Sequence, residues 1–132
     1  MRKNQLVICC MLIITLLLAN DKVTTKPKQF RFNQSTIQAF YFVRNATILG
    51  DPIDTDDWIA SFNDTVCVGS RKWNGEYTDI PAMGSDNSSY SRAYLMPGNT
   101  PLFFIYDKSE NLTYLAKTKY TEPFGRGMAQ IF

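Results

Sequence analysis

Apolar and polar residues alternate over short stretches of this chain, and no stretch keeps a 3.6-residue period over three helical turns. Aromatic and β-branched residues gather in the alternating stretches, while Gly, Pro, Asn and Asp separate them. This pattern is typical of strands joined by tight turns. The expected strands are 39–43, 46–50, 58–62, 65–69, 90–95, 101–106, 112–117 and 128–132, after an alternating segment at 29–33.

About eight short strands at this spacing predict an all-β fold, an immunoglobulin-like antiparallel β-sandwich. Asn63-Asp64 is a two-residue hairpin signal, because both residue types tolerate positive φ. The prediction also allows a strand from a neighbouring subunit to complete the sandwich.

The beginning of the chain has the pattern of a secretory signal peptide. Arg2 and Lys3 precede the apolar run Leu6–Ala19, which is shorter than the roughly 20 residues of a membrane-spanning helix. We therefore expect a signal peptide at 1–20, an extended polar lead-in at 21–29 and a single β-sandwich domain at 30–132. An uncleaved signal anchor is the alternative. The expected location is extracellular, with no membrane segment in the mature form.

Charge and cysteine content restrict the partners further. The chain has 14 Lys and Arg against 12 Asp and Glu residues, and Arg2 and Lys3 account for the difference. A neutral mature domain gives no electrostatic reason to expect nucleic-acid binding. Cys9 and Cys10 belong to the signal, so Cys67 is expected to be a buried free thiol, with an intermolecular disulfide as the alternative.

N-glycosylation sequons are the strongest motif signal. Asn-x-Ser/Thr occurs five times after the signal, far above chance, and a glycan requires an accessible acceptor. We therefore expect N-linked glycans on surface residues. The five acceptors are Asn33, Asn45, Asn63, Asn87 and Asn111.

Catalytic motifs are missing from the sequence. The chain has no His, which removes most catalytic triads, general-base arrangements and zinc sites, and no phosphate-binding or nucleophile-elbow motif occurs. We therefore expect a protein that is not an enzyme and requires no cofactor.

Two weaker groups of residues suggest ligands. Four carboxylates in one loop have the hard oxygen ligands that Ca²⁺ prefers, although a solvated turn with Asx hydrogen bonds explains them equally simply. Exposed aromatic residues could stack on sugars, although aromatic residues in strands are more often core. The acidic group is Asp51, Asp54, Asp56 and Asp57, and the aromatic group is Trp58, Trp73, Tyr77, Tyr90 and Tyr94.

Several segments together resemble a β-sandwich module of secreted and cell-surface proteins of environmental bacteria, many exported by the type IX route. The chain is also similar to subunits of helical fibres from pond water, in which an extended segment of one protomer completes the sheet of the next. The resemblance implies a β-sandwich fold and an extracellular location. The segments are STIQAFYFV (35–43), GDPIDTDDWIASFN (50–63), VCVGSRKW (66–73), DIPAMGSD (79–86) and YLMPGNTPLFFIYD (94–107).

Two functions follow as hypotheses. In the first, the protein is the structural subunit of an extracellular glycosylated filament, a homopolymer joined head-to-tail by N-terminal strand exchange. Phe30 and Phe32 would enter the neighbouring subunit, because a strand has a two-residue period, while Arg31 and Asn33 face solvent. In the second, the protein is a monomeric carbohydrate-binding or adhesive module at the cell surface.

Overall fold

The computed structural model describes residues 25–125 and 129–131. The predicted signal peptide and the first four residues of the predicted lead-in lie outside the described residues. The described part of the chain contains two single-turn 3-10 helices, η1 (Lys28–Phe30) and η2 (Ser89–Ser91), and nine short strands. The strands are β1 (Gln38–Val43), β2 (Thr47–Ile48), β3 (Asp51–Pro52), β4 (Trp58–Asn63), β5 (Val66–Lys72), β6 (Thr78–Met83), β7 (Leu102–Asp107), β8 (Leu112–Leu115) and β9 (Ala129–Ile131).

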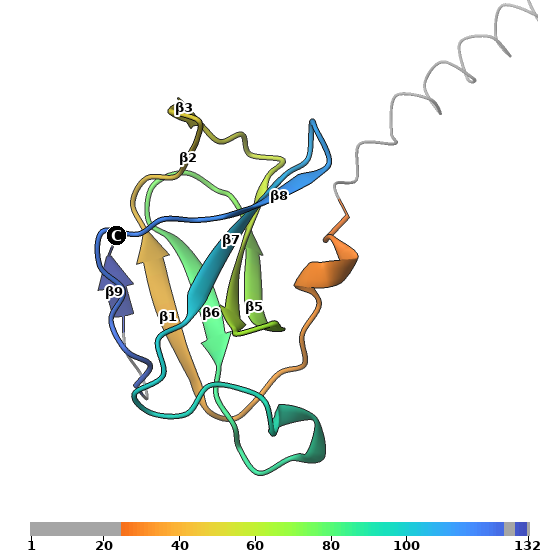
Figure 1. Ribbon diagram of the computed structural model, residues 1–132, viewed down its shortest axis with the longest axis vertical. Coiled ribbons are helices and arrows are strands. Elements are labelled where there is room, and N and C mark those ends of the chain that lie inside the picture. Colours follow the sequence, from red (N-terminus) through yellow and green to blue (C-terminus); the bar gives the residue numbers. More distant parts are fainter. Residues whose placement is uncertain (1–24, 126–128, 132) are drawn as a thin grey trace, which may run out of the picture.

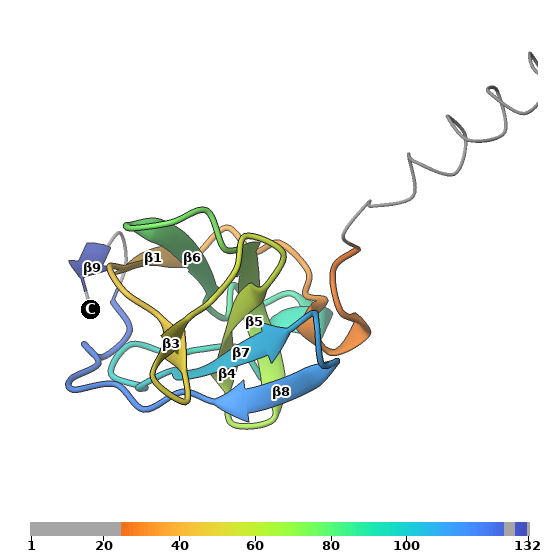
Figure 2. The same ribbon diagram turned by 90° about the horizontal axis from the view of Figure 1, so that it is seen from above.

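Two sheets pack face to face. One has the order β6-β1-β9 and the other β5-β4-β7-β8, while β2 and β3 form a separate two-residue hairpin. All pairings are antiparallel except that of β9, which runs parallel to β1 at the sheet edge. Figure 2 shows the smaller sheet lying over the larger one. The predicted all-β sandwich is confirmed.

The main hydrophobic cluster fills the space between the sheets. On β1 the burial pattern alternates, so that Ala39, Tyr41 and Val43 face inward and are buried. Ile59 and Phe103 enter from the opposite sheet, and the Tyr41 and Phe103 rings meet edge to face at 5.3 Å between centroids. Aromatic side chains therefore supply much of the core volume, as the aromatic content of the sequence indicates.

The edge of the sandwich between β5 and β6 is tightly closed. Ser61 donates its hydroxyl hydrogen to the carbonyl oxygen of Pro81, at 2.7 Å between oxygens, across the two sheets. A Cβ at Gly69 would overlap that same carbonyl, so this position has room only for glycine. A register shift between Ser61 and Phe62 places the buried Val68 beside Gly69 as an extra residue, as in a β-bulge.

Two expectations about strands are wrong. Residues 90–95 form no strand: η2 and a turn lead to Tyr94 and Leu95, which are nevertheless buried in the main cluster. Conversely, β6 was not among the expected strands, and Pro81 lies in its middle. Pro81 is tolerated because β6 pairs with β1 on one side only, as the edge strand of its sheet. No helix among the described residues is long and apolar enough to cross a membrane.

Candidate functional site

The outer face of the four-stranded sheet is unusually apolar. On β4, Trp58, Ala60 and Phe62 point outward because Ile59 and Ser61 point into the sandwich. Phe104 and Tyr106 take the same face of β7, and the Phe62 and Phe104 rings meet edge to face at 4.7 Å between centroids. With the buried Cys67 of β5, these residues form a second cluster, which we call the outer cluster.

A single segment, residues 25–32, covers part of the outer cluster. Its Phe30 side chain is fully buried, with ring centroids 6.0 Å from Phe62 and 6.3 Å from Tyr106, both in edge-to-face geometry. Phe32 is half-buried against the same cluster. Figure 1 shows this segment on the side of the molecule away from β1 and β9. Burying a Phe side chain stabilises such a contact by about 1.5–3 kcal/mol before ordering costs.

Few polar contacts hold this segment to the sheet. Ser70 of β5 donates its hydroxyl to the carbonyl oxygen of Phe30 at 2.8 Å, and Gln29 donates its amide to the Thr113 hydroxyl of β8 at 3.1 Å. The ammonium group of Lys26 lies 4.8 Å from the ring centre of Phe32 and 5.6 Å from that of Trp58. Cation–π contacts at such partly exposed positions contribute about 0.5–1 kcal/mol each.

Burial under the segment has consequences for two polar groups. The indole N–H of Trp58 is covered but finds no acceptor among the described residues. A buried donor without a partner destabilises the covered state by about 1–3 kcal/mol. Burial raises the pKa of the Cys67 thiol to about 11, partly offset by a backbone hydrogen bond with Gly69 and by the charge of Lys26. The predicted burial of Cys67 is confirmed, and it forms no disulfide within the described residues, while an intermolecular disulfide stays an untested alternative.

The expectation that residues 29–33 form a strand is wrong for the described chain. Pro27 begins a 3-10 turn in which Phe30 N–H donates to the Pro27 carbonyl, and the chain is extended only from Arg31. Burial still alternates as the sequence indicates, since Arg31 and Asn33 are exposed while Phe30 and Phe32 turn toward the sheet. The two phenylalanines pack on their own domain, and their insertion into a second subunit stays a prediction.

A short extended connection joins this segment to β1. The backbone of Asn33 exchanges two hydrogen bonds with the Tyr94 hydroxyl, which donates to its carbonyl and accepts from its N–H. The Thr36 N–H donates to a carboxylate oxygen of Asp86 at 2.9 Å. The point at which the segment would leave its own domain therefore lies before Asn33, because the chain from there on is fastened to the sandwich.

The five sequon asparagines all lie on loops or strand ends. Asn33, Asn45, Asn87 and Asn111 are exposed, and the last two have the positive φ values, 72° and 55°, of tight turns. Asn63 is half-buried, and its side-chain nitrogen donates to the carbonyls of Ala93 and Tyr94. A glycan attaches to that nitrogen, so modification at Asn63 would remove one of these two bonds. Glycosylation at all five positions stays a prediction.

The acidic loop does not gather its carboxylates. Asp57 is buried, and its two oxygens accept from the backbone N–H groups of Asp54 and Lys108. Asp56 pairs with Lys72 at 3.3 Å, while Asp51 is exposed on β3. In the described residues no three acidic, Cys or His side chains come close enough to hold a metal ion. The geometry is that of an Asx-type turn, and calcium binding stays an untested prediction.

The aromatic residues considered for sugar stacking do not share a surface. Trp73 and Tyr94 are buried in the main cluster, whereas Trp58 belongs to the outer cluster. Tyr77 and Tyr90 are about half exposed, one just before β6 and the other in η2. These five side chains therefore do not form one flat stacking platform.

Comparisons with protein-family models, with curated proteins and with solved structures give no significant match for this chain. The resemblance to bacterial β-sandwich modules and to fibre subunits therefore stays a prediction from the sequence. The geometry of the outer cluster carries the functional argument.

Proposed function

We propose that this protein is a structural subunit of an extracellular glycosylated filament, joined head-to-tail by exchange of its N-terminal segment. The observation that carries the proposal is the outer cluster. One short segment at the chain's N-terminal side supplies the buried Phe30 to it, and none of the buried residues of the main cluster belongs to that segment, although its half-buried Phe32 packs against both clusters.

Exchange between copies would reproduce the same contacts in trans. If residues 25–32 of one subunit leave their own sheet, Phe30 can dock between Phe62 and Tyr106 of the next subunit. A head-to-tail contact of this kind builds a helical fibre when its rotation does not close into a ring. The buried Trp58 N–H, which has no acceptor among the described residues, and the small number of polar contacts limit the stability of the segment on its own sheet, which makes its detachment easier.

The direct test is the assembly state of the secreted protein. The full chain expressed in a eukaryotic secretory host should form fibres visible by negative-stain microscopy. Replacing Phe30→Ser together with Phe32→Ser should give folded monomers without fibres. The matched control is Arg31→Ser, an exposed position of the same segment, which should leave fibres intact.

Cross-linking separates exchange from docking within one subunit. In a Gln29→Cys/Thr113→Cys variant, a short bismaleimide should join the two positions between subunits and give a ladder of covalent oligomers on a gel. A Thr113→Ala variant controls for the loss of the Asn111 sequon, which includes Thr113. Fibres with only monomeric cross-links would refute segment exchange, and isolated particles would refute the filament and favour the carbohydrate-binding alternative.

A further inference from the structure

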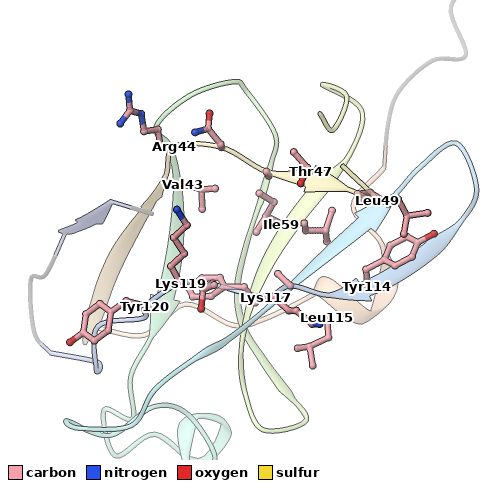
Figure 3. A pocket seen from close by; sticks show the side chains of 17 residues that line it. Val43, Arg44, Thr47, Leu49, Ile59, Tyr114, Leu115, Lys117, Lys119 and Tyr120 are labelled. Carbon is pink, nitrogen blue, oxygen red and sulfur yellow. The ribbon is translucent and has the colours of Figure 1, made fainter. Parts of the chain in front are cut away.

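The edge of the sandwich opposite the closed β5–β6 edge is open. A groove of about 790 Å³ lies there, between the end of β1, the β2 region and the segment that follows β8. Its volume falls within the range of about 300–1,000 Å³ of ordinary ligand pockets. In Figure 3, Ile59 lies near the middle of the opening, with Arg44 and Lys119 on one side and Leu49 and Tyr114 on the other.

The floor of the groove is the main cluster itself. Val43, Ile59, Phe103 and Ile105 belong to the inter-sheet core and also line this groove, although each is less than a tenth exposed, so the bottom of the groove is an apolar surface beneath its rim. These four side chains offer no hydrogen-bonding group. A sugar or a peptide backbone would leave its polar groups unpaired against such a floor.

The rim of the groove carries charge of one sign. Arg44, Lys117 and Lys119 line it, and no acidic residue does. None of these three side chains forms an ion pair within the described residues. The nearby Glu122 engages the Tyr120 hydroxyl. An apolar floor under an unpaired basic rim requires a ligand with an apolar body and a negative end.

We propose that this groove binds a single long-chain fatty acid, with its hydrocarbon chain over Val43, Ile59 and Phe103 and its carboxylate at the basic rim. Lys and Arg donors to a carboxylate give charge-assisted hydrogen bonds, which are about twice as strong as neutral ones. The same rim disfavours the basic N-terminal segment of another subunit, with Lys26, Lys28 and Arg31, so the groove is distinct from the assembly surface. The proposal is independent of the filament proposal.

The test uses cis-parinaric acid, a fluorescent long-chain fatty acid, with the full secreted protein. Binding should enhance its fluorescence, and palmitate should displace it. Hexadecanol, which has the same chain and no charge, should compete about tenfold less well, because a charged hydrogen bond contributes about 1.5 kcal/mol or more. Absence of binding, or equal competition by the alcohol, would overturn the proposal.

Two variants locate the ligand. Ala116→Trp fills the groove from its wall and should abolish binding, whereas Leu102→Trp, exposed on the outer sheet face, should not. Lys117→Glu/Lys119→Glu should weaken binding about tenfold or more, whereas Lys108→Glu on the β7–β8 turn should leave it unchanged. Undiminished binding by the folded Lys117→Glu/Lys119→Glu variant refutes the site even if the Trp variant does not fold.

Discussion

The two hydrophobic clusters of this protein differ in how they are covered. The main cluster lies between two sheets, so side chains from both sheets and from the 94–95 turn enclose it. The outer cluster has a sheet on one side and, among the described residues, only the segment 25–32 on the other. Phe30 in the outer cluster is as fully buried as Tyr41 in the main one, and both are aromatic. Burial alone therefore does not reveal which part of the fold can come apart.

What separates the two clusters is the amount of structure that opening them disrupts. Exposing Tyr41 requires separation of the sheets, which breaks the whole sandwich. Exposing the outer cluster requires only the segment before Asn33 to detach, with loss of the hydrogen bonds from Ser70 and Gln29. Local opening of this kind has a free energy below that of global unfolding. The predictions below test this difference.

The largest effect is expected at the closed edge of the main cluster. Gly69→Ala places a Cβ against the carbonyl oxygen of Pro81, a backbone atom that cannot move without shifting β6. We expect a loss of about 4 kcal/mol or more in the free energy of unfolding, measured by urea denaturation. Gly84→Ala is the comparison: its Cβ would lie 2.7–2.8 Å from side-chain atoms of Phe124 and Ile37 rather than against a backbone atom, so a smaller loss is expected. Equal losses for Gly69→Ala and Gly84→Ala would show that the edge between β5 and β6 is not tightly packed.

Truncation within the main cluster comes next. Ile80 is fully buried on β6, so Ile80→Ala should lower the free energy of unfolding by about 2–5 kcal/mol. Phe30→Ala should lower it by less, because the outer segment can detach and leave the sandwich folded. The measurement is urea unfolding monitored by circular dichroism. A larger effect of Phe30→Ala would show that the outer cluster is part of the global core.

Cys67 reports directly on the outer segment. Burial holds its thiol pKa at about 11, against 9.0 for an exposed thiol, so detachment that exposes the thiol fully should raise the thiolate fraction at neutral pH by about a hundredfold. We therefore expect Phe30→Ala to speed alkylation of Cys67 by a soluble maleimide by about that factor. The control Arg31→Ser should label slowly, like the unsubstituted protein. Fast labelling of the unsubstituted protein would contradict burial under the segment.

The smallest effect concerns the connection between the segment and β1. The Ser88 hydroxyl, then the Thr36 backbone N–H and the Ser91 hydroxyl, hold the pKa of Asp86 well below its usual range. Because the folded pKa is depressed, this contribution to stability is present above about pH 4 and is lost as the pH falls through the folded value. Asp86→Asn should therefore destabilise the protein at pH 7, measured on protein made without N-glycosylation because the change also creates a sequon with Ser88.

The difference between Asp86→Asn and the unsubstituted protein should shrink on acidification. Urea midpoints at neutral pH and at about pH 2.5 measure it, the lower value lying below the usual Asp pKa. The control is Ser109→Ala, which removes a hydrogen bond to Asp107 in an exposed turn and leaves the connection between the segment and β1 unchanged. A difference that is the same at both pH values would show that the Asp86 charge does not stabilise the connection.

The local pattern of apolar and polar residues predicted the strands that have regular alternation and clear turns at their ends. A hairpin between β4 and β5 was predictable because Asp64, with φ of 54°, adopts a conformation that its residue type tolerates, although the two turn residues are Asp64 and Thr65 and not Asn63 and Asp64. Glycosylation sequons and the lone Cys67 were equally readable, since both depend on residue identity. The structure of residues 90–95 and the strand β6 could not be predicted from the sequence. Burial of Tyr94 and the edge position of Pro81 both depend on partners that are distant in the chain.

The sequence by itself thus determined the all-β sandwich, the alternation of Phe30 and Phe32 with Arg31 and Asn33, and the absence of His. Only the tertiary structure decided that Lys28–Phe30 forms a turn, because Pro27 and the outer face of the sheet favour it over strand pairing. The basic rim of the groove was also hidden from the sequence. Arg44 and Lys119 are far apart in the chain, and side-chain charges from such distant positions meet only when the sheets pack.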